Sequence, residues 1–311
     1  MAMEIPLILL LSLVIDMSLG EPPMVIHPVS WMGKVISFLV KGGAGRSPLV
    51  QFLYGLVIVL FTVALFVTPV YFLLSYLKDL NSVAYVLAGV ILFKITFSLK
   101  GLRRAAFRVK DWLAEDKLDE ARFELRSLVG RDTTRLDKSL MISATVESVA
   151  ENACDSFVAP LFYFLFLGVP GAVAYRVINT FDAMIGHHGE FEYLGKFAAR
   201  LDSVANFIPA RITALIIMLA AWICKKSASG AWQIMLRDRI KTESPNAGWT
   251  MSAIAGALGV QLEKVSYYKL GDNHNSLSLN TIDASLRIVT TTALIWSLLL
   301  IVVEVIYHAT T

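Results

Sequence analysis

The feature that most constrains the fold is an uncharged, strongly apolar stretch at residues 51–77. About 20 consecutive apolar residues let an α-helix cross the hydrocarbon core of a bilayer. This stretch is therefore long enough to span a membrane, and Pro69 marks a place where the helix can kink. Only 17% of the residues are charged, against roughly 25% in soluble domains. We expect an integral membrane protein.

Other apolar segments predict an all-α, polytopic membrane fold that forms one membrane-embedded helical domain over residues 1–311. Residues 83–99, with Lys94 as their one charge, are expected to return across the membrane, and residues 204–224 and 288–306 supply further helices. Residues 5–19 reach only about 22 Å as a helix, which is less than a hydrocarbon core of about 30 Å. They predict a short buried or interfacial helix. Because they lack a basic leader and a small-residue cleavage site, we expect them to be retained.

The charged loops indicate the orientation. Lys100 opens a basic run that ends at Lys110, and an excess of Lys and Arg marks the cytoplasmic side of a membrane protein. Residues 100–140 therefore predict a cytoplasmic helical hairpin, with a single mixed-charge helix at 111–126, and residues 225–285 form a second polar segment. A net charge of +3 gives no basis for nucleic-acid binding.

A Gly-Val-Pro-Gly sequence at residues 168–171 interrupts the apolar segment 157–178. Polar clusters lie on both sides of this segment, at 147–155 and 179–182. A single crossing would place the clusters on opposite sides of the membrane, whereas a re-entrant hairpin returns both to one side. Irregular backbone is tolerated at membrane depth where protein surrounds it. We favour the hairpin.

Residues 141–211 form the expected catalytic core, because polar groups are costly in an apolar setting unless something satisfies them. Glu147, Glu151 and Asp155 are spaced four residues apart, with Asn152 beside them, and form one acidic ridge on a helix. Carboxylate and amide oxygens suit Mg²⁺. The alternative is a solvated helix face.

Two further polar pairs share predicted helix faces. One is Asn179 with Asp182, and the other is Asp202 with Asn206. Each pair alone is weak evidence. Together with the ridge they could hold one or two Mg²⁺ ions and a nucleoside triphosphate, since arginines such as the nearby Arg211 are suited to hold phosphoryl groups.

The remaining candidates are less specific. His187 and His188 point to different sides of a helix, so we expect a loop or interface role for them. His27 precedes a proline, and we favour it over the other two histidines as a functional residue. Ser244-Pro-Asn246-Ala-Gly resembles a turn that closes onto a ligand or opens a helix, and free N–H groups there can hold an anion. Cys154 and Cys224 are expected to be buried small side chains. No P-loop, Gly-x-Gly-x-x-Gly or zinc-type spacing is present.

These stretches resemble the adenosylcobinamide-phosphate synthase family of cobalamin biosynthesis, and the resemblance covers nearly the whole chain in the family's order. Two departures are Glu21, where the family has Asp, and the His187-His188-Gly189 continuation. The stretches that carry the resemblance are Gly20-Glu-Pro-Pro23, His27-Pro-Val29, Gly130-Arg-Asp-Thr133, Glu147-Ser-Val-Ala-Glu151-Asn152 with Asp155, Ala159 and Pro160, Asn179-Thr-Phe-Asp182-Ala-Met-Ile-Gly186, Ala199-Arg-Leu-Asp202, Asn206-Phe-Ile-Pro-Ala-Arg211 and Ser244-Pro-Asn-Ala-Gly248.

The resemblance implies an ATP- and Mg²⁺-dependent amide ligase that joins the free propionate of adenosylcobyric acid to (R)-1-aminopropan-2-ol or its phosphate. The resemblance places it in the lipid bilayer of the cell (cytoplasmic) membrane and implies other enzymes of the corrinoid pathway as partners. The product is adenosylcobinamide or its phosphate. The metal candidates are Glu147, Glu151, Asp155, Asn179 and Asp182; the catalytic candidates are Asp202, His27 and Lys196; the substrate and ATP candidates are Arg131, Asp132, Asn152, Arg200, Asn206, Arg211, Ser244 and Asn246.

Two other functions stay open at this point. A Mg²⁺-dependent membrane transferase acting on a lipid diphosphate also uses an acidic ridge facing a membrane cavity. An ion-coupled transporter would have inverted halves, and the sequence contains no internal repeat. The topology is open as well: if residues 204–224 cross completely, Ser244 to Gly248 would lie opposite the acidic ridge.

Overall fold

The computed structural model describes residues 4–20, 28–43, 45–186, 189 and 191–310. These residues form two compact units. Unit 1 comprises Met1–Ser98, Ala159–Ala205 and Leu299–Thr311, and unit 2 comprises Leu99–Val158 and Asn206–Leu298.

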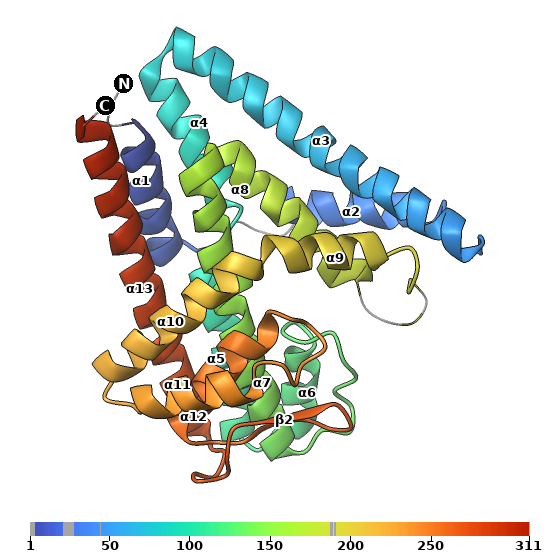
Figure 1. The fold of residues 1–311 in the computed structure, drawn as a ribbon, viewed down its shortest axis with the longest axis vertical. Helices are drawn as coiled ribbons and strands as arrows, with labels where there is room; N and C mark the ends of the chain where they lie inside the picture. The colour runs from blue at the N-terminus through green and yellow to red at the C-terminus, as the bar shows by residue number, and fades with distance from the viewer. Residues whose placement is uncertain (1–3, 21–27, 44, 187–188, 190, 311) are drawn as a thin grey trace. The chain divides into compact units, whose positions relative to one another are not determined.

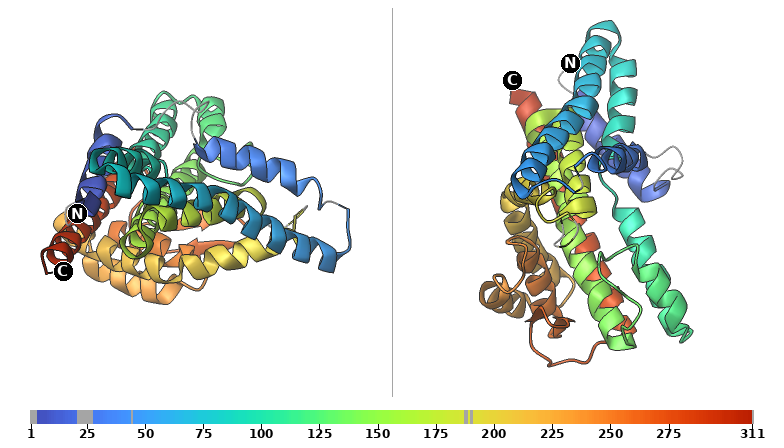
Figure 2. Two further views of the ribbon diagram at one scale, coloured as in Figure 1. Left: turned by 90° about the horizontal axis from the view of Figure 1, so that it is seen from above. Right: turned by 90° about the vertical axis from the view of Figure 1, so that its right-hand side faces the viewer.

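The helices of unit 1 follow the apolar segments of the sequence. They are α1 (Glu4–Ser18), α2 (Pro28–Val40), α3 (Pro48–Leu80), α4 (Ser82–Lys94), α8 (Ala159–Ile185), α9 (Lys196–Ala205) and the end of α13 (Leu279–Thr310). Proline opens α3, where its missing N–H costs nothing. Asn81 ends α3, and its side chain accepts the Ala84 N–H at 2.9 Å to start α4. The two helices therefore form a tight hairpin (Figures 1 and 2).

The short helix α1, predicted to be buried or interfacial, is buried along one side, whereas Leu7, Leu10 and Val14 are exposed. Ile8 and Leu9 are fully covered, α1 packs on α4, and the Ser12 hydroxyl donates to the Val90 carbonyl at 3.2 Å.

Helix α8 folds back on itself at Gly168, where Figure 1 shows a sharp bend. Gly168 has φ +63° and ψ −159°, a conformation that is essentially restricted to glycine. The rings of Tyr163 and Tyr175 stack with centroids 5.3 Å apart. A straight helix would separate these two residues by about 18 Å. The predicted hairpin at Gly-Val-Pro-Gly is therefore present in the backbone, and its re-entry into a membrane stays a prediction.

Unit 2 surrounds a buried central helix. Its elements are α5 (Leu99–Ala114), α6 (Leu118–Leu125), α7 (Lys138–Ala153), the π-helical turn η1 (Cys154–Val158), α10 (Phe207–Ile223), α11 (Ala228–Asp238), α12 (Ala247–Leu258), the strands β1 (Leu262–Lys264) and β2 (Tyr268–Leu270), and the first part of α13. Every residue of α7 from Met141 to Ala150 is buried. Helices α5, α6 and α12 and strand β1 pack against α7.

One local prediction in unit 2 was wrong, and one feature of this unit was not predicted. The helix expected at residues 111–126 is broken at Asp116, whose φ is +58°, so α5 and α6 form the helical hairpin instead. The polar segment 225–285 contains the antiparallel strands β1 and β2, paired from Leu262 opposite Leu270 to Lys264 opposite Tyr268, which the sequence reading did not anticipate.

By length and composition, four helical runs in the described residues can cross a membrane. They are Pro48–Leu80, Ser82–Ala114, Lys138–Ile185 and Leu279–Tyr307, with Lys196–Ala205 and Phe207–Ile223 as a broken fifth. Many large apolar side chains of α3, such as Val57 and Leu60, are more than half exposed, as expected of a helix that faces lipid. The predicted all-α, polytopic membrane fold is confirmed.

Candidate functional site

Glu147 is the most heavily engaged acidic residue of the predicted ridge. Its side chain is only about one-twentieth exposed, and three donors converge on its carboxylate. Ser143, one turn earlier in α7, donates to Oε1 at 2.7 Å. The Tyr268 hydroxyl donates to Oε2 at 3.0 Å, and an Arg131 guanidinium nitrogen lies 3.2 Å from the same oxygen. A buried carboxylate is tolerated when it is paired in this way.

Tyr268 reaches Glu147 from strand β2. Burial raises the pKa of Tyr268 far above its usual range, and the Glu147 and Glu151 carboxylates raise it further. The hydroxyl therefore keeps its proton and acts as a donor. Ser143 fixes the strand pair in place, because its Oγ accepts the Glu263 N–H at 2.7 Å.

Arg131 comes from the loop between α6 and α7. Thr133 anchors this loop by donating to the Arg122 carbonyl at 2.8 Å. Asp132 points elsewhere: its Oδ1 accepts the N–H and the hydroxyl of Thr134, hydrogen bonds that lower the pKa of Asp132. Asp132 thus shapes an exposed turn. Arg131, which was predicted as a binding residue together with it, contacts Glu147 of the acidic ridge.

The rest of the acidic ridge lies towards the end of α7. Asn152 donates to the Ser148 carbonyl at 3.0 Å and accepts the Ser156 hydroxyl at 2.7 Å. Glu151 and Asp155 are both half-buried. Asp155 lies in the π-helical turn, so the regular four-residue α-helical spacing that predicted a straight ridge ends before it. Such turns inside helices are frequent at functional sites.

Helices α10, α11 and α12 run back and forth, which brings Ser244 to Gly248 beside the start of α10. Arg211, in the first turns of α10, donates to Asn246 Oδ1 at 3.1 Å. At the far end, Ser227 precedes α11 and its N–H donates to Ala257 near the end of α12. The return through α11 therefore brings the motif to the Arg211 end of α10, and the side of the membrane on which it lies stays a prediction.

Helix α12, which follows this motif, contacts the Tyr268 hydroxyl that binds Glu147. Met251 of α12 has its sulfur 3.9 Å from the Tyr268 hydroxyl. In the same unit, Asn206 accepts from the Cys154 thiol at 3.7 Å. Cys154 is a buried, unbridged cysteine.

A second polar group lies in unit 1. Asn179 donates to Asp202 Oδ1 at 3.3 Å, and Arg176 donates to Asn179 Oδ1 at the same distance. The Arg176 Nε also donates to the Thr96 carbonyl at 2.7 Å. Asp202 is buried. The chain thus holds a buried carboxylate through a short relay of polar side chains.

Asp182 is half-buried close to this group in the sequence. A Cβ at Gly186 would lie 2.0 Å from Asp182 Oδ1, so glycine is needed for the carboxylate to fold against the end of α8. Lys196 opens α9 and Arg200 is exposed on it. Asp202 and Asn206 are not on one continuous helix, because the helix is interrupted by a turn at Asn206, between α9 and α10.

The described residues thus contain two polar groups, one in each unit, and the predicted union of Asn179 and Asp182 with the acidic ridge stays a prediction. His27, His187 and His188 lie outside the described residues. Within the described part, no group of three or more His, Cys, Asp or Glu side chains is arranged to bind a metal ion.

Sequence reasoning missed three residues that hold these groups. Ser143 lies one helical turn before Glu147, a spacing that could have identified it. Arg176 precedes Asn179 by three residues on the same helix. Tyr268 gave no local signal, because its approach depends on the β1–β2 pair.

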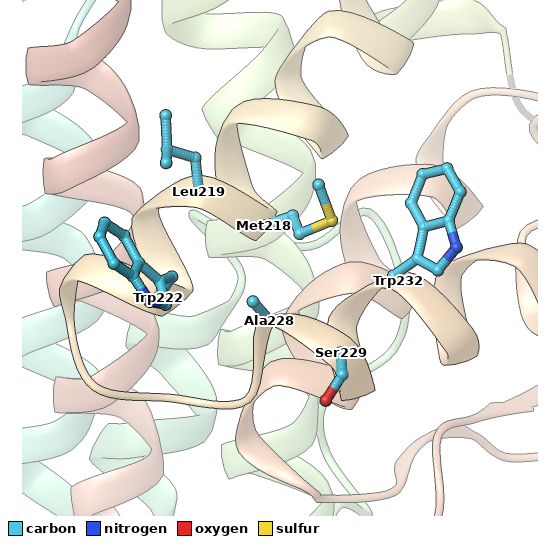
Figure 3. A pocket seen from close by; sticks show the side chains of 6 residues that line it. All are labelled: Met218, Leu219, Trp222, Ala228, Ser229 and Trp232. Atoms are coloured by element: carbon cyan, nitrogen blue, oxygen red, sulfur yellow. The ribbon is translucent and has the colours of Figure 1, made fainter.

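An apolar hollow of about 360 Å³ between α10 and α11 does not belong to either polar group. Figure 3 shows it from close by. It is lined by Met218, Leu219, Trp222, Ala228, Ser229 and Trp232. Only Ser229 brings a hydroxyl group, so the hollow offers no acid–base chemistry.

Residues 9–296 match the model of the CobD/Cbib protein family. This chain belongs to that family. "Cobalamin biosynthesis protein CobD" of Dehalococcoides mccartyi is 54% identical over 307 residues, which cover 99% of each chain. "Probable cobalamin biosynthesis protein CobD" of Methanothermobacter thermautotrophicus is 39% identical over 94% of this chain and 95% of its own. The protein of the same name from Pyrococcus furiosus is 40% identical over 83% and 85%. No solved structure matches this chain.

Proposed function

We propose that this CobD/CbiB-family protein is an ATP- and Mg²⁺-dependent amide ligase of cobalamin biosynthesis in the cytoplasmic membrane. It would join the free propionate of adenosylcobyric acid to (R)-1-aminopropan-2-ol or its phosphate. The names of its relatives support the pathway. The observation that supports the chemistry most is the buried Glu147 with Arg131 and Tyr268 around it, on a helix that continues to Glu151.

The reaction needs an activated carboxylate. A propionate oxygen would attack the terminal phosphorus of ATP, giving an acyl phosphate and ADP. The amine nitrogen would then attack the acyl carbon, phosphate would leave, and a base would accept the proton that the nitrogen loses. Asp202 is the candidate base among the described residues, because Asn179 holds its carboxylate in place.

The donor chemistry of the acidic helix fits Mg²⁺. This ion is usually held by one or two carboxylates together with phosphate oxygens and waters, so Glu151 and Asp155 are sufficient protein ligands. Glu147 already accepts from three protein groups, and its part in the proposal is to position Arg131. When bound, the ion would neutralise phosphate charge. Asn179 and Asp182 remain proposed additional ligands.

Cationic side chains would bind the anionic and amide groups of the substrates. Arg131, Lys196, Arg200 and Arg211 are the proposed residues, since guanidinium groups bind phosphate oxygens through two parallel hydrogen bonds. Ser244 and Asn246 stand beside Arg211: Ser244 Oγ accepts the Asn246 and Ala247 N–H groups at 3.3 Å and so shapes the turn.

The decisive experiment is an ATP-consumption assay of the detergent-purified protein with Mg²⁺. Adenosylcobyric acid and each form of the amine are added singly and together, and the product is analysed by mass spectrometry. We expect ADP formation that requires both the corrinoid and an amine, with one amide formed per ATP. No coupled hydrolysis with either amine would overturn the proposal, and prenyl diphosphates would then test the transferase alternative.

A further inference from the structure

Two arginines lie against one tryptophan in unit 2. The guanidinium carbon of Arg211 is 4.7 Å from the centre of the Trp249 ring, and that of Arg239 is also 4.7 Å from it. The guanidinium carbons of the two arginines are therefore no further apart than twice 4.7 Å. Among the described residues, no carboxylate forms an ion pair with either of them.

The scaffold fixes both arginines. Arg211 lies over the Phe207 ring, 3.5 Å from its centre, and donates to Asn246. Arg239 follows α11, and its carbonyl lies against the start of α12, where a Cβ at Gly248 would approach it to 2.2 Å. The glycine of the Ser-Pro-Asn-Ala-Gly motif thus lets Trp249 come close to both cations.

The neighbouring acids are used elsewhere. Asp238 is fully buried between Arg237 and Lys241, with ion pairs of 2.8 and 2.6 Å. Asp272 binds Arg237 as well. Cation–π contacts offset only part of the repulsion between two guanidinium groups, so an anion between them would stabilise the arrangement.

We propose that Arg211, Arg239 and Trp249 form a subsite for a phosphate group of a substrate. The inference rests on the proposed function and adds Arg239 and Trp249 to its binding residues. Planar guanidinium groups match the oxygens of a phosphate, and two unneutralised charges suit a phosphomonoester or a polyphosphate. The phosphate belongs to ATP or to the phosphorylated amine, and the experiment distinguishes these two sources.

The test is calorimetric binding to the full-length protein in detergent, without turnover. The ligands are ATP, pyrophosphate, aminopropanol phosphate, aminopropanol and adenosylcobyric acid, each alone and without Mg²⁺. Arg239→Gln is expected to weaken binding of the phosphate-bearing ligand about tenfold, and Trp249→Phe by less. Lys226→Gln, which removes an exposed charge beyond the other end of α10, is the matched control and is expected to bind normally.

Weakened binding of ATP and pyrophosphate assigns the subsite to the triphosphate, and weakened binding of aminopropanol phosphate but not aminopropanol assigns it to the amine. Unchanged binding of all phosphate ligands, or a loss confined to adenosylcobyric acid, would overturn the inference. If Arg239→Gln does not fold, Arg239→Lys and Trp249→Phe carry the test. Calorimetry measures binding and not turnover, so the two proposals can fail separately. If the protein binds phosphate through these residues but forms no amide in the ATP-consumption assay, the proposed function is refuted and the subsite stands.

Discussion

Lys94 and Asp16 form an ion pair in the interior of unit 1, with 3.0 Å between Lys94 Nζ and Asp16 Oδ1. Both side chains are almost fully buried. The lysine also donates to the Phe97 carbonyl at 3.3 Å and lies over the Phe97 ring. The pair joins the short helix α1 to α4, which explains how an apolar helix can carry an acid.

Removing one member of this pair should be worse than removing both. Asp16→Ala or Lys94→Ala leaves a buried charge without its partner and should cost about 3–5 kcal/mol of stability. The double variant Asp16→Leu with Lys94→Met should recover most of that loss. Thermal unfolding in detergent, followed by size-exclusion chromatography, measures this, with the exposed Lys78→Met as the control. A loss in the double variant equal to the sum of the two single losses would show that the pair is not coupled.

Loss of the Tyr268 hydroxyl should impair catalysis more than folding. Tyr268→Phe removes one donor to Glu147, whereas Ser143 and Arg131 remain. We expect kcat to fall about ten- to a hundredfold, since one hydrogen bond to a charged group is worth roughly 1.5–3 kcal/mol. Tyr267→Phe, on the exposed neighbour, serves as the control. An unchanged kcat would remove Tyr268 from the site.

Variants of Glu151 test the proposed metal site without disturbing the structural role of Glu147. Glu151→Ala should abolish turnover while the protein still inserts in the membrane, and the conservative Glu151→Gln should not restore it, because an amide binds Mg²⁺ more weakly than a carboxylate. Initial rates across a range of Mg²⁺ concentrations measure the loss of turnover. Glu115→Gln, on the exposed α5–α6 loop, is the control. Normal turnover in Glu151→Ala would refute the metal assignment.

Apolar length and local breakers predicted much of the fold. The uncharged stretch at 51–77 became α3, and the Gly-Val-Pro-Gly sequence marked the bend of α8, because both depend only on neighbouring residues. Asp116 was missed, since a left-handed aspartate leaves little trace in a sequence that otherwise favours a helix.

The candidate site was less predictable because its contacts are long-range. Glu147 was identified from its spacing, yet its partner Tyr268 lies 121 residues away. Lys94 and Asp16 were each visible as isolated charges in apolar runs, but their pairing depends on how α1 packs against α4. Spacing along one helix reveals its faces, whereas the side chains that meet a face come from elsewhere in the chain.

Asp238 should make the protein sensitive to acid. Burial acts to raise its pKa, but hydrogen bonds from Arg237, Lys241 and the Gly271 N–H outweigh burial and hold the pKa at about 2. An unfolded aspartate has a pKa of about 3.9. The ionised group therefore stabilises the fold fully above about pH 5, by roughly 2–3 kcal/mol, and this contribution is lost as the pH falls through 4 towards 2.

Asp238→Asn should consequently be less stable at pH 7 and show a smaller further loss between pH 4 and pH 2. Unfolding curves of both proteins at a series of pH values measure the difference. Asp272→Asn, on the more exposed partner of Arg237, should change stability little. A parallel decline of wild type and Asp238→Asn through this pH range would rule out Asp238 as the source.

The bend of α8 should depend on Gly168. Gly168→Ala forces a Cβ into a backbone conformation with φ +63° and ψ −159°, which should cost about 1–3 kcal/mol and loosen the stacking of Tyr163 on Tyr175. Gly33→Ala is the matched control, because its φ is ordinary and its Cβ would meet only the Met184 sulfur at 3.7 Å. A cysteine pair at positions 163 and 175 reports the bend by its crosslinking rate. We expect slower crosslinking in Gly168→Ala and a normal rate in Gly33→Ala; equal rates would mean that the two arms are held together without the glycine.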